Sequence, residues 1–306
     1  MASSFQKHQF TILMVIFHVI FLMIYAIFAE FDPNTGMPGA KSDTVTYLNS
    51  KYAMFQDTHV MIFIGFGFLM TFLRRYGFSA VSVNMLLACF VIEWGMIING
   101  FLSHEFKEQG KFFINLEGML SADFATAIIL ISMGAMLGKL SPSQYLVMAF
   151  IETPVALVIE HIVIHSLHIN DVGDSIVVHT FGAYFGLACS RGFAKKAQRG
   201  HENEGSIYHT DIFAMIGTLF LWVFWPSFNG GAAEPADARH RAVMNTFLSL
   251  VACTLTAFLA SQFVDHHKRF NMVHMANATI AGGDEVSAAF VVVTRGVEEV
   301  EETGES

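Results

Sequence analysis

Long apolar stretches constrain this chain more than any other feature. A helix needs about 20 mostly apolar residues to cross the hydrocarbon core of a bilayer. About eight stretches of this kind follow one another, with short polar loops between them. The chain is therefore predicted to be an all-α, polytopic transmembrane helix bundle. The expected spans fall near residues 10–29, 56–73, 80–102, 118–138, 144–167, 174–194, 211–228 and 242–264.

A ninth span begins at Met272 and is expected to be broken. Asp284 and Glu285 stand in the middle of it, and each costs up to about 3 kcal/mol at the centre of a membrane. Residues 284–306 carry most of the formal net charge of -9. We expect them to form a divergent acidic tail on the cytoplasmic side.

Composition agrees with membrane insertion. Hydrophobic residues make up 54% and charged residues 14% of the 306 residues, with a mean hydropathy of +0.50. An average soluble domain carries about 25% charged residues. No basic stripe is present, which argues against nucleic-acid binding. No nucleophile–base pair or cofactor motif stands out, so neither enzyme activity nor a cofactor is predicted.

Lysine and arginine set the expected orientation. With the N-terminus in the cytoplasm, most of these residues fall on the cytoplasmic side, as the positive-inside rule requires. The opposite face is then acidic overall, and it would attract cations. The first apolar run could instead be a cleaved signal peptide, but it is long for one. A retained anchor helix is favoured.

Ionisable residues inside spans are costly, so each is a functional candidate. His179 could line a path for a small polar molecule, or it could be a core histidine bonded to a neighbouring helix. Asp171 and Asp174 could shape a vestibule or cap a helix N-terminus, and capping is favoured. Asp123 is a further candidate because it lies inside a span.

Three other patterns have simpler interpretations. His161, His165 and His168 share one helical face, but they lack the H-E-x-x-H zinc pattern, so no metal site is predicted. The pairs Gly134/Gly138 and Gly182/Gly186 have the spacing that allows close helix packing in lipid. The cysteines, which are expected to be small buried hydrophobic residues, are Cys89, Cys189 and Cys253.

Several long motifs resemble a known family. They are the run from Met54 to Phe78, Val178-His-Thr-Phe-Gly-Ala-Tyr-Phe-Gly-Leu187, Asp211-Ile-Phe-Ala-Met-Ile-Gly-Thr-Leu-Phe-Leu-Trp222, Trp225-Pro-Ser-Phe-Asn229 and Met272-Val-His-Met-Ala-Asn-Ala-Thr-Ile-Ala-Gly-Gly283. They are similar to the Rh (Rhesus) glycoprotein branch of the ammonium transporter family. The resemblance implies a bundle of two inverted five-helix repeats, assembled as a trimer with one pore per subunit.

The resemblance also implies roles for individual residues. His179 matches the first of two pore-lining histidines, and Phe124 and Phe228 match two stacked phenylalanines that gate the pore from outside. Asp171 matches a vestibule carboxylate, and Glu160 matches a carboxylate linked to the outer entrance. With Asp123, these form a set of vestibule or structural carboxylates.

The implied function is transmembrane passage of ammonium or ammonia, with carbon dioxide as a second candidate substrate. Acids on the outer face would attract ammonium. Carrying the bare ion through an apolar pore would cost several kcal/mol in desolvation, and loss of a proton first removes most of that cost. Neutral ammonia would then pass along the histidines. We expect a multi-pass protein of the plasma membrane.

The resemblance stops after Gly283. Residues 1–283 are therefore expected to be the membrane domain, with the first repeat complete and the second partial. No histidine follows Gly283 that could be the second pore histidine. A second hypothesis follows: a truncated, non-transporting form that associates with full-length Rh subunits in trimers and modulates them.

Overall fold

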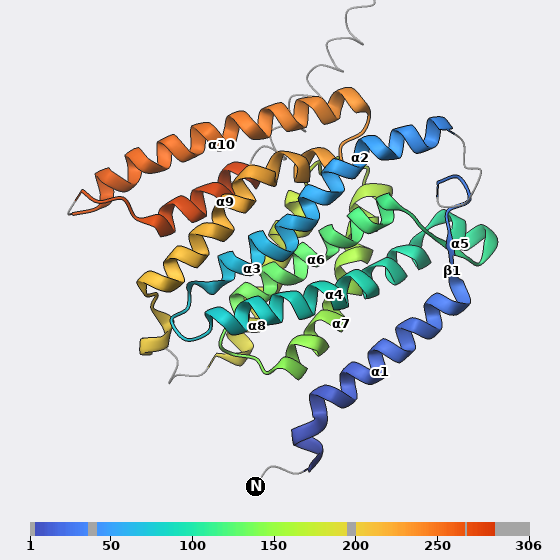
Figure 1. The fold of residues 1–306 in the computed structure, drawn as a ribbon, viewed down its shortest axis with the longest axis horizontal. Helices are drawn as coiled ribbons and strands as arrows, with labels where there is room; N and C mark the ends of the chain where they lie inside the picture. Colours follow the sequence, from blue (N-terminus) through green and yellow to red (C-terminus); the bar gives the residue numbers. More distant parts are fainter. Residues whose placement is uncertain (1–3, 36–41, 195–199, 267, 285–306) are drawn as a thin grey trace, which may run out of the picture.

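The computed structural model describes residues 4–35, 42–194, 200–266 and 268–284 (Figure 1). These residues are almost entirely helical, which confirms the predicted class of fold. The helices and strands are α1 (Ser4–Phe28), β1 (Ala29–Phe31), α2 (Ser42–Val60), η1 (Met61–Gly65), α3 (Phe66–Leu69), η2 (Met70–Phe72), α4 (Gly77–Leu102), α5 (His104–Gln109), β2 (Phe112–Ile114), α6 (Leu116–Met136), α7 (Pro142–His161), η3 (Ile162–Ser166), η4 (Ser175–Phe181), α8 (Gly182–Phe193), η6 (Glu202–Glu204), α9 (Tyr208–Gly231) and α10 (Ala236–Val264).

Seven helices among the described residues are long and apolar enough to cross a membrane. They correspond to the predicted spans except 174–194. That segment folds as two consecutive pieces, the π-helix η4 followed by the short helix α8. The predicted ninth span is helical over residues 272–284. The expected acidic tail lies outside the described residues apart from Asp284.

Helix α6 lies at the centre of the bundle. Within its most apolar stretch 72% of the residues are buried, against 6% in α1 and 11% in α10. Figure 1 shows α1 along one edge of the molecule and α10 along the opposite edge. Helix α6 packs against α4 on one side and α8 on another. A candidate site that draws on α6 is therefore an interior site.

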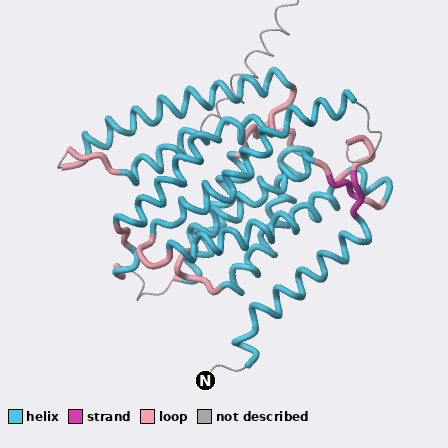
Figure 2. The backbone as a smooth tube through the Cα atoms, in the orientation of Figure 1, coloured by secondary structure: helices cyan, strands magenta, loops and turns pink. Residues whose placement is uncertain are grey.

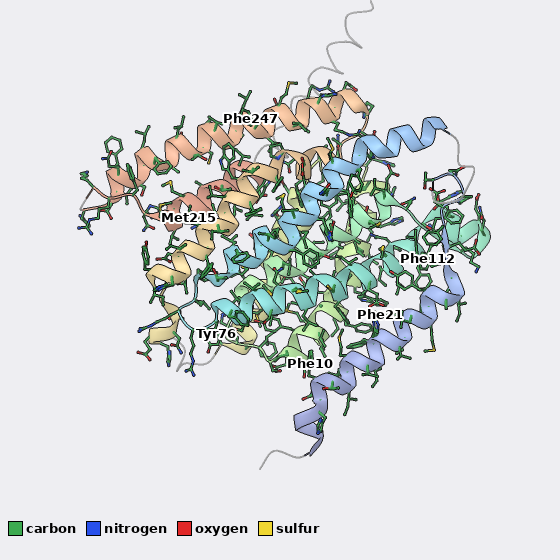
Figure 3. All side chains as sticks on the ribbon, in the orientation of Figure 1. Phe10, Phe21, Tyr76, Phe112, Met215 and Phe247 are labelled. Carbon is green, nitrogen blue, oxygen red and sulfur yellow. The ribbon has the colours of Figure 1, made fainter. Side chains whose placement is uncertain are left out.

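Aromatic side chains attach the outermost helix, α1. Phe21 is fully buried and stacks on Trp94 of α4 with ring centroids 4.8 Å apart. Figure 3 labels Phe21 where α1 faces the rest of the bundle. At one end of the molecule β1 and β2 form a short parallel pair, with Ala29 opposite Phe112 (Figure 2). These contacts fix α1 although most of its surface is exposed.

Two detailed expectations differ from the structure. Cys89 is exposed on α4, and Cys189 and Cys253 are only half-buried, so the prediction of buried cysteines is wrong. Gly138 lies beyond the end of α6 with a φ of 74°, in a turn rather than on a helix face. A turn with positive φ is itself a reason for glycine at that position.

Candidate functional site

His179 lies in the interior of the bundle, on η4. Its side chain is 11% exposed. The imidazole is nearly parallel to the Trp225 indole, at 5.8 Å between centroids and 22° between planes. The Phe228 ring lies 5.9 Å away on the same helix, α9. Trp225 Nε1 is buried and has no hydrogen-bond partner among the described residues. A buried imidazole thus stands beside an indole N–H that can still donate.

Phe124 and Phe228 form an aromatic pair next to His179. Phe124 comes from α6 and Phe228 from α9, and the two side chains are buried. Their centroids are 4.7 Å apart with an interplanar angle of 89°. The rings therefore meet edge to face. Edge-to-face contact is one of the two favoured geometries because the ring edge is positive and the face negative.

Asp171 positions the helix that carries His179. Its Oδ2 accepts hydrogen bonds from the backbone N–H groups of Ile176 (2.9 Å) and Val177 (3.1 Å). Burial raises the pKa of Asp171, and these N–H bonds act in the opposite direction. Asp174 adopts the left-handed conformation at the start of η4 and makes no side-chain cap. Of the two candidate capping residues, Asp171 makes the capping hydrogen bonds and Asp174 makes none.

Helix 272–284 reaches the site through backbone carbonyls. Asn229 Nδ2 donates to the Gly283 carbonyl over 2.9 Å, and Ser175 Oγ donates to that of Asp284 over 2.7 Å. Gly283 packs on the Trp225 indole so closely that a Cβ there would lie 2.1 Å from Trp225 Cε2. Glycine is required at this point because any side chain would displace the indole.

The Asp284 side chain lies next to His179. Asp284 Oδ1 lies 3.1 Å from His179 Nε2, close enough for an ion pair when the imidazole is protonated. Sequence reasoning placed Asp284 in a tail rather than in the site. The available signal was the motif Met272–Gly283. It ends directly before Asp284, and in the structure its last residue packs on Trp225 in the bundle interior.

Asp123 is a buried partner of a histidine. His59 Nδ1 on α2 lies 3.0 and 3.1 Å from the two Asp123 carboxylate oxygens. Asp123 is 1% exposed, whereas the His59 side chain is 43% exposed. Nearby, Ser227 Oγ on α9 donates to Asp57 Oδ2 over 2.6 Å. These contacts join α2 to α6 and α9 beside the phenylalanine pair, and His59 was missed in the sequence.

Glu160, Asp171 and Asp174 form a separate group of carboxylates. The charges of Glu160 and Asp171 both act on Asp174, so the three lie close together. Neighbouring carboxylates repel one another unless a proton or a cation comes between them. The charged neighbour of Asp123 is instead His59.

The histidine pattern breaks up in the structure. The rings of His161 and His165 are 4.5 Å apart, but His168 follows the end of η3 with a φ of 52° and so leaves the helical face. Among the described residues no three His, Cys, Asp or Glu side chains are grouped as a metal site requires.

Comparisons with known proteins identify related sequences. Residues 12–296 match the model of the Ammonium Transporter Family. "Ammonium transporter Rh type A" of Canis lupus familiaris is 51% identical over 233 residues, which cover 76% of this chain and 55% of that protein. "Ammonium transporter Rh type B-B" of Xenopus laevis is 42% identical over 290 residues, covering 92% of this chain and 63% of that protein.

A solved structure is similar as well. Nitrosomonas europaea Rh50, described as a member of the Rhesus protein family of channels, superposes with a TM-score of 0.72 at 32% identity. The superposition covers 81% of this chain and 65% of the solved chain. The chain thus spans somewhat more than half the length of the proteins that it matches, and the family match runs past Gly283.

Proposed function

Because the chain belongs to the ammonium transporter family, as a multi-pass membrane protein of its Rh type, we propose that it conducts ammonium or ammonia across a membrane. The observation that carries the proposal is the arrangement around His179. A buried imidazole lies within 5.9 Å of a phenylalanine whose edge-to-face partner comes from another helix. Residues 1–283 form the membrane domain of this proposal.

The chemistry of the site favours neutral ammonia at His179. An ion that leaves water for an apolar interior loses its hydration, and this costs several kcal/mol unless charged partners replace the water. Ammonia needs only hydrogen bonds. Its lone pair can accept from the free N–H of Trp225, and its N–H can donate to an imidazole nitrogen of His179. The buried Phe124 and Phe228 rings exclude water from the space beside His179 and Trp225.

The carboxylate group supplies an attraction for the cation before the proton is lost. Glu160 lies near the end of α7, and Asp171 and Asp174 lie just before η4. The mutual repulsion of the three acids is relieved when a monovalent cation binds among them. Asp123 belongs to the structural contacts, because its two carboxylate oxygens already lie 3.0 and 3.1 Å from His59 Nδ1. Ammonium thus meets acids first and aromatic rings second.

A vesicle assay tests the role of His179. The full chain is reconstituted, ammonium chloride is added outside, and a dye inside reports the rise in pH as ammonia enters. We expect His179→Ala to lower the protein-dependent rate roughly tenfold, since one lost hydrogen-bond partner for a desolvated molecule costs about 1–3 kcal/mol. His209→Ala, which changes an exposed histidine at the start of α9, is the matched control. Equal rates in the wild type and His179→Ala would refute the role.

Asp284 favours a second candidate function. Its carboxylate lies 3.1 Å from His179 Nε2, where it competes with ammonia for that nitrogen. In this form the chain joins trimers with full-length Rh subunits and lowers or tunes their flux. The variant Asp284→Ala separates the candidates. Flux that rises on this change supports the blocked form, and unchanged flux from an active chain rules it out. Coexpression with a full-length relative tests the modulation.

We also propose the location and orientation of the chain. It resides in the plasma membrane. Its N-terminus is cytoplasmic, because lysine and arginine concentrate on that side. Carbon dioxide is the alternative neutral cargo. It would acidify the same vesicles instead of alkalinising them, so one assay distinguishes the two gases.

A further inference from the structure

Polar groups from three helices meet at the start of α8. Ser132 on α6 lies between Glu152 on α7 and the backbone carbonyl of Gly182, the first residue of α8. Ser132 Oγ is within hydrogen-bond distance of Glu152 Oε1 and lies 2.8 Å from the Gly182 carbonyl oxygen. Both side chains are fully buried, at 0% exposure. We call the set formed by Glu152, Ser132 and the Gly182 carbonyl the Glu152 contact.

Close packing makes the contact rigid. A Cβ on Gly182 would lie 2.9 Å from the Ile128 carbonyl, and one on Gly186 would lie 2.8 Å from Ser132 Cα. Helix α8 therefore approaches the α6 backbone closely at Ile128 and again at Ser132. The Gly182 N–H in turn bonds to the carbonyls of Val178 and His179. A displacement of Gly182 would therefore also move the helical turn that carries His179.

Counting protons fixes the chemical state of the contact. A serine hydroxyl has one proton to donate, whereas a backbone carbonyl and an ionised carboxylate can only accept. One proton cannot serve both Glu152 and Gly182. Glu152 Oε2 has no hydrogen-bond partner among the described residues, and no ion pair in that part of the chain includes Glu152. An ionised carboxylate here would be buried without compensation, which is strongly unfavourable.

We propose that Glu152 is held as a neutral carboxylic acid and acts as a positioning residue for His179. Its acid proton is donated to Ser132 Oγ, and the Ser132 proton is thereby directed to the Gly182 carbonyl. Every donor in the chain of bonds is then used. The protonated state stands on the geometry alone, while the consequence for the pore rests on the proposed function.

Infrared spectroscopy of the purified full chain in lipid tests the protonation. The difference spectrum between the wild type and Glu152→Gln at neutral pH is expected to contain the carbonyl stretch of a protonated carboxylic acid. Ser132→Ala is expected to move that band to higher frequency, because the hydrogen bond is lost. Glu93→Gln, which changes a partly exposed acid on α4, is the control and should leave the band in place. Carboxylate bands in place of the acid band would overturn the proposal.

Amide hydrogen exchange over residues 175–186 tests the positioning. We expect Glu152→Gln to exchange like the wild type, because its amide can donate to Ser132. Ser132→Ala and Glu152→Ala are each expected to exchange about fivefold faster, the effect of one lost hydrogen bond. The double variant Ser132→Ala with Glu152→Gln should match Ser132→Ala alone, since both changes affect one chain of bonds. Exchange in Glu152→Gln as fast as in Glu152→Ala would overturn the positioning role.

Neither measurement needs transport. Absence of ammonia flux in the wild type would refute the proposed function and leave the infrared and exchange results to decide on Glu152. If the wild type is active, Glu152→Gln should keep at least half of its flux.

Discussion

At the scale of single residues, charge and hydrogen bonding determine which side chains shape the site. Asp171 caps η4 with two backbone bonds, and Asp123 is paired with His59. The structure separates them, because one acid faces backbone N–H groups and the other faces an imidazole.

The pH dependence of stability reports on Asp171. Burial raises its pKa above the ordinary 3.8, so the folded chain disfavours the ionised form. The contribution of Asp171 to stability is therefore largest below pH 3.8 and falls as the pH rises through the raised value. Asp171→Asn does not titrate. We expect the unfolding temperature of the wild type, relative to Asp171→Asn, to decline over this range. A difference that grows with pH would contradict the expectation.

Removing one partner of the pair between His59 and Asp123 should cost stability. We expect His59→Ala to lower the free energy of unfolding by about 1.5–3 kcal/mol, the range for hydrogen bonds to charged groups. His59→Ala combined with Asp123→Leu should lose less than the sum of the single changes, because no acid is left without its partner. Denaturant unfolding in detergent measures all four proteins of the cycle. Additive losses would show that the pair does not interact.

At the scale of helices, close approaches determine how the elements cross. Gly217 on α9 faces the chain at the end of α3, where a Cβ would lie 2.1 Å from Leu69 N and 2.6 Å from the Gly65 carbonyl. Because backbone atoms are the neighbours, neither can move aside without moving a helix. This crossing fixes α9, which carries Trp225 and Phe228, relative to the first half of the chain.

Two helical glycines provide a matched pair of substitutions. Gly217→Ala is expected to destabilise the bundle strongly or prevent folding, because the added methyl group collides with backbone. Gly192→Ala on α8 has no described atom within 4 Å of its added Cβ, so it should leave stability unchanged or raise it by up to about 1 kcal/mol. Thermal unfolding and the yield of folded protein compare the two. Equal effects would contradict the proposed crossing.

The sequence predicted what depends on local composition and missed what depends on packing. The α4 and α7 spans were found because twenty apolar residues in a row leave little choice. The contact between His59 and Asp123 was missed because it joins residues 64 apart. Glu152 was missed because a single acid in an apolar run gives no sign of its partner. The pairing of Phe124 with Phe228 came from resemblance, which supplied the partners and not their angle.

At the scale of the whole molecule, the distribution of lysine and arginine supports the proposed orientation. Gln109 lies at the end of α5, near the strand pair, on the face that is proposed to be external. The backbone N–H of Arg74 donates to the Gly205 carbonyl. This bond joins two loops that are proposed to lie on the opposite, cytoplasmic face. Among the acids on the face that is proposed to be external, Glu117 and Glu234 both pair with Lys51.

Labelling of single cysteines tests the orientation. In a background without Cys89, Cys189 and Cys253, we expect a membrane-impermeant maleimide to label Gln109→Cys on intact cells. It should label Gly205→Cys only after the membrane is permeabilised. Both positions are exposed, so accessibility within the protein does not differ. The reverse pattern would place the N-terminus outside.

The central claim is that the elements around His179 form a path for neutral ammonia. Its most direct measurement is the rate at which ammonium chloride alkalinises vesicles that contain only this chain, relative to protein-free vesicles of the same lipid. We expect a faster rate, with no electrical current, because the species that passes His179 is uncharged. A rate equal to that of protein-free vesicles, or a rate matched by inward current, would contradict it.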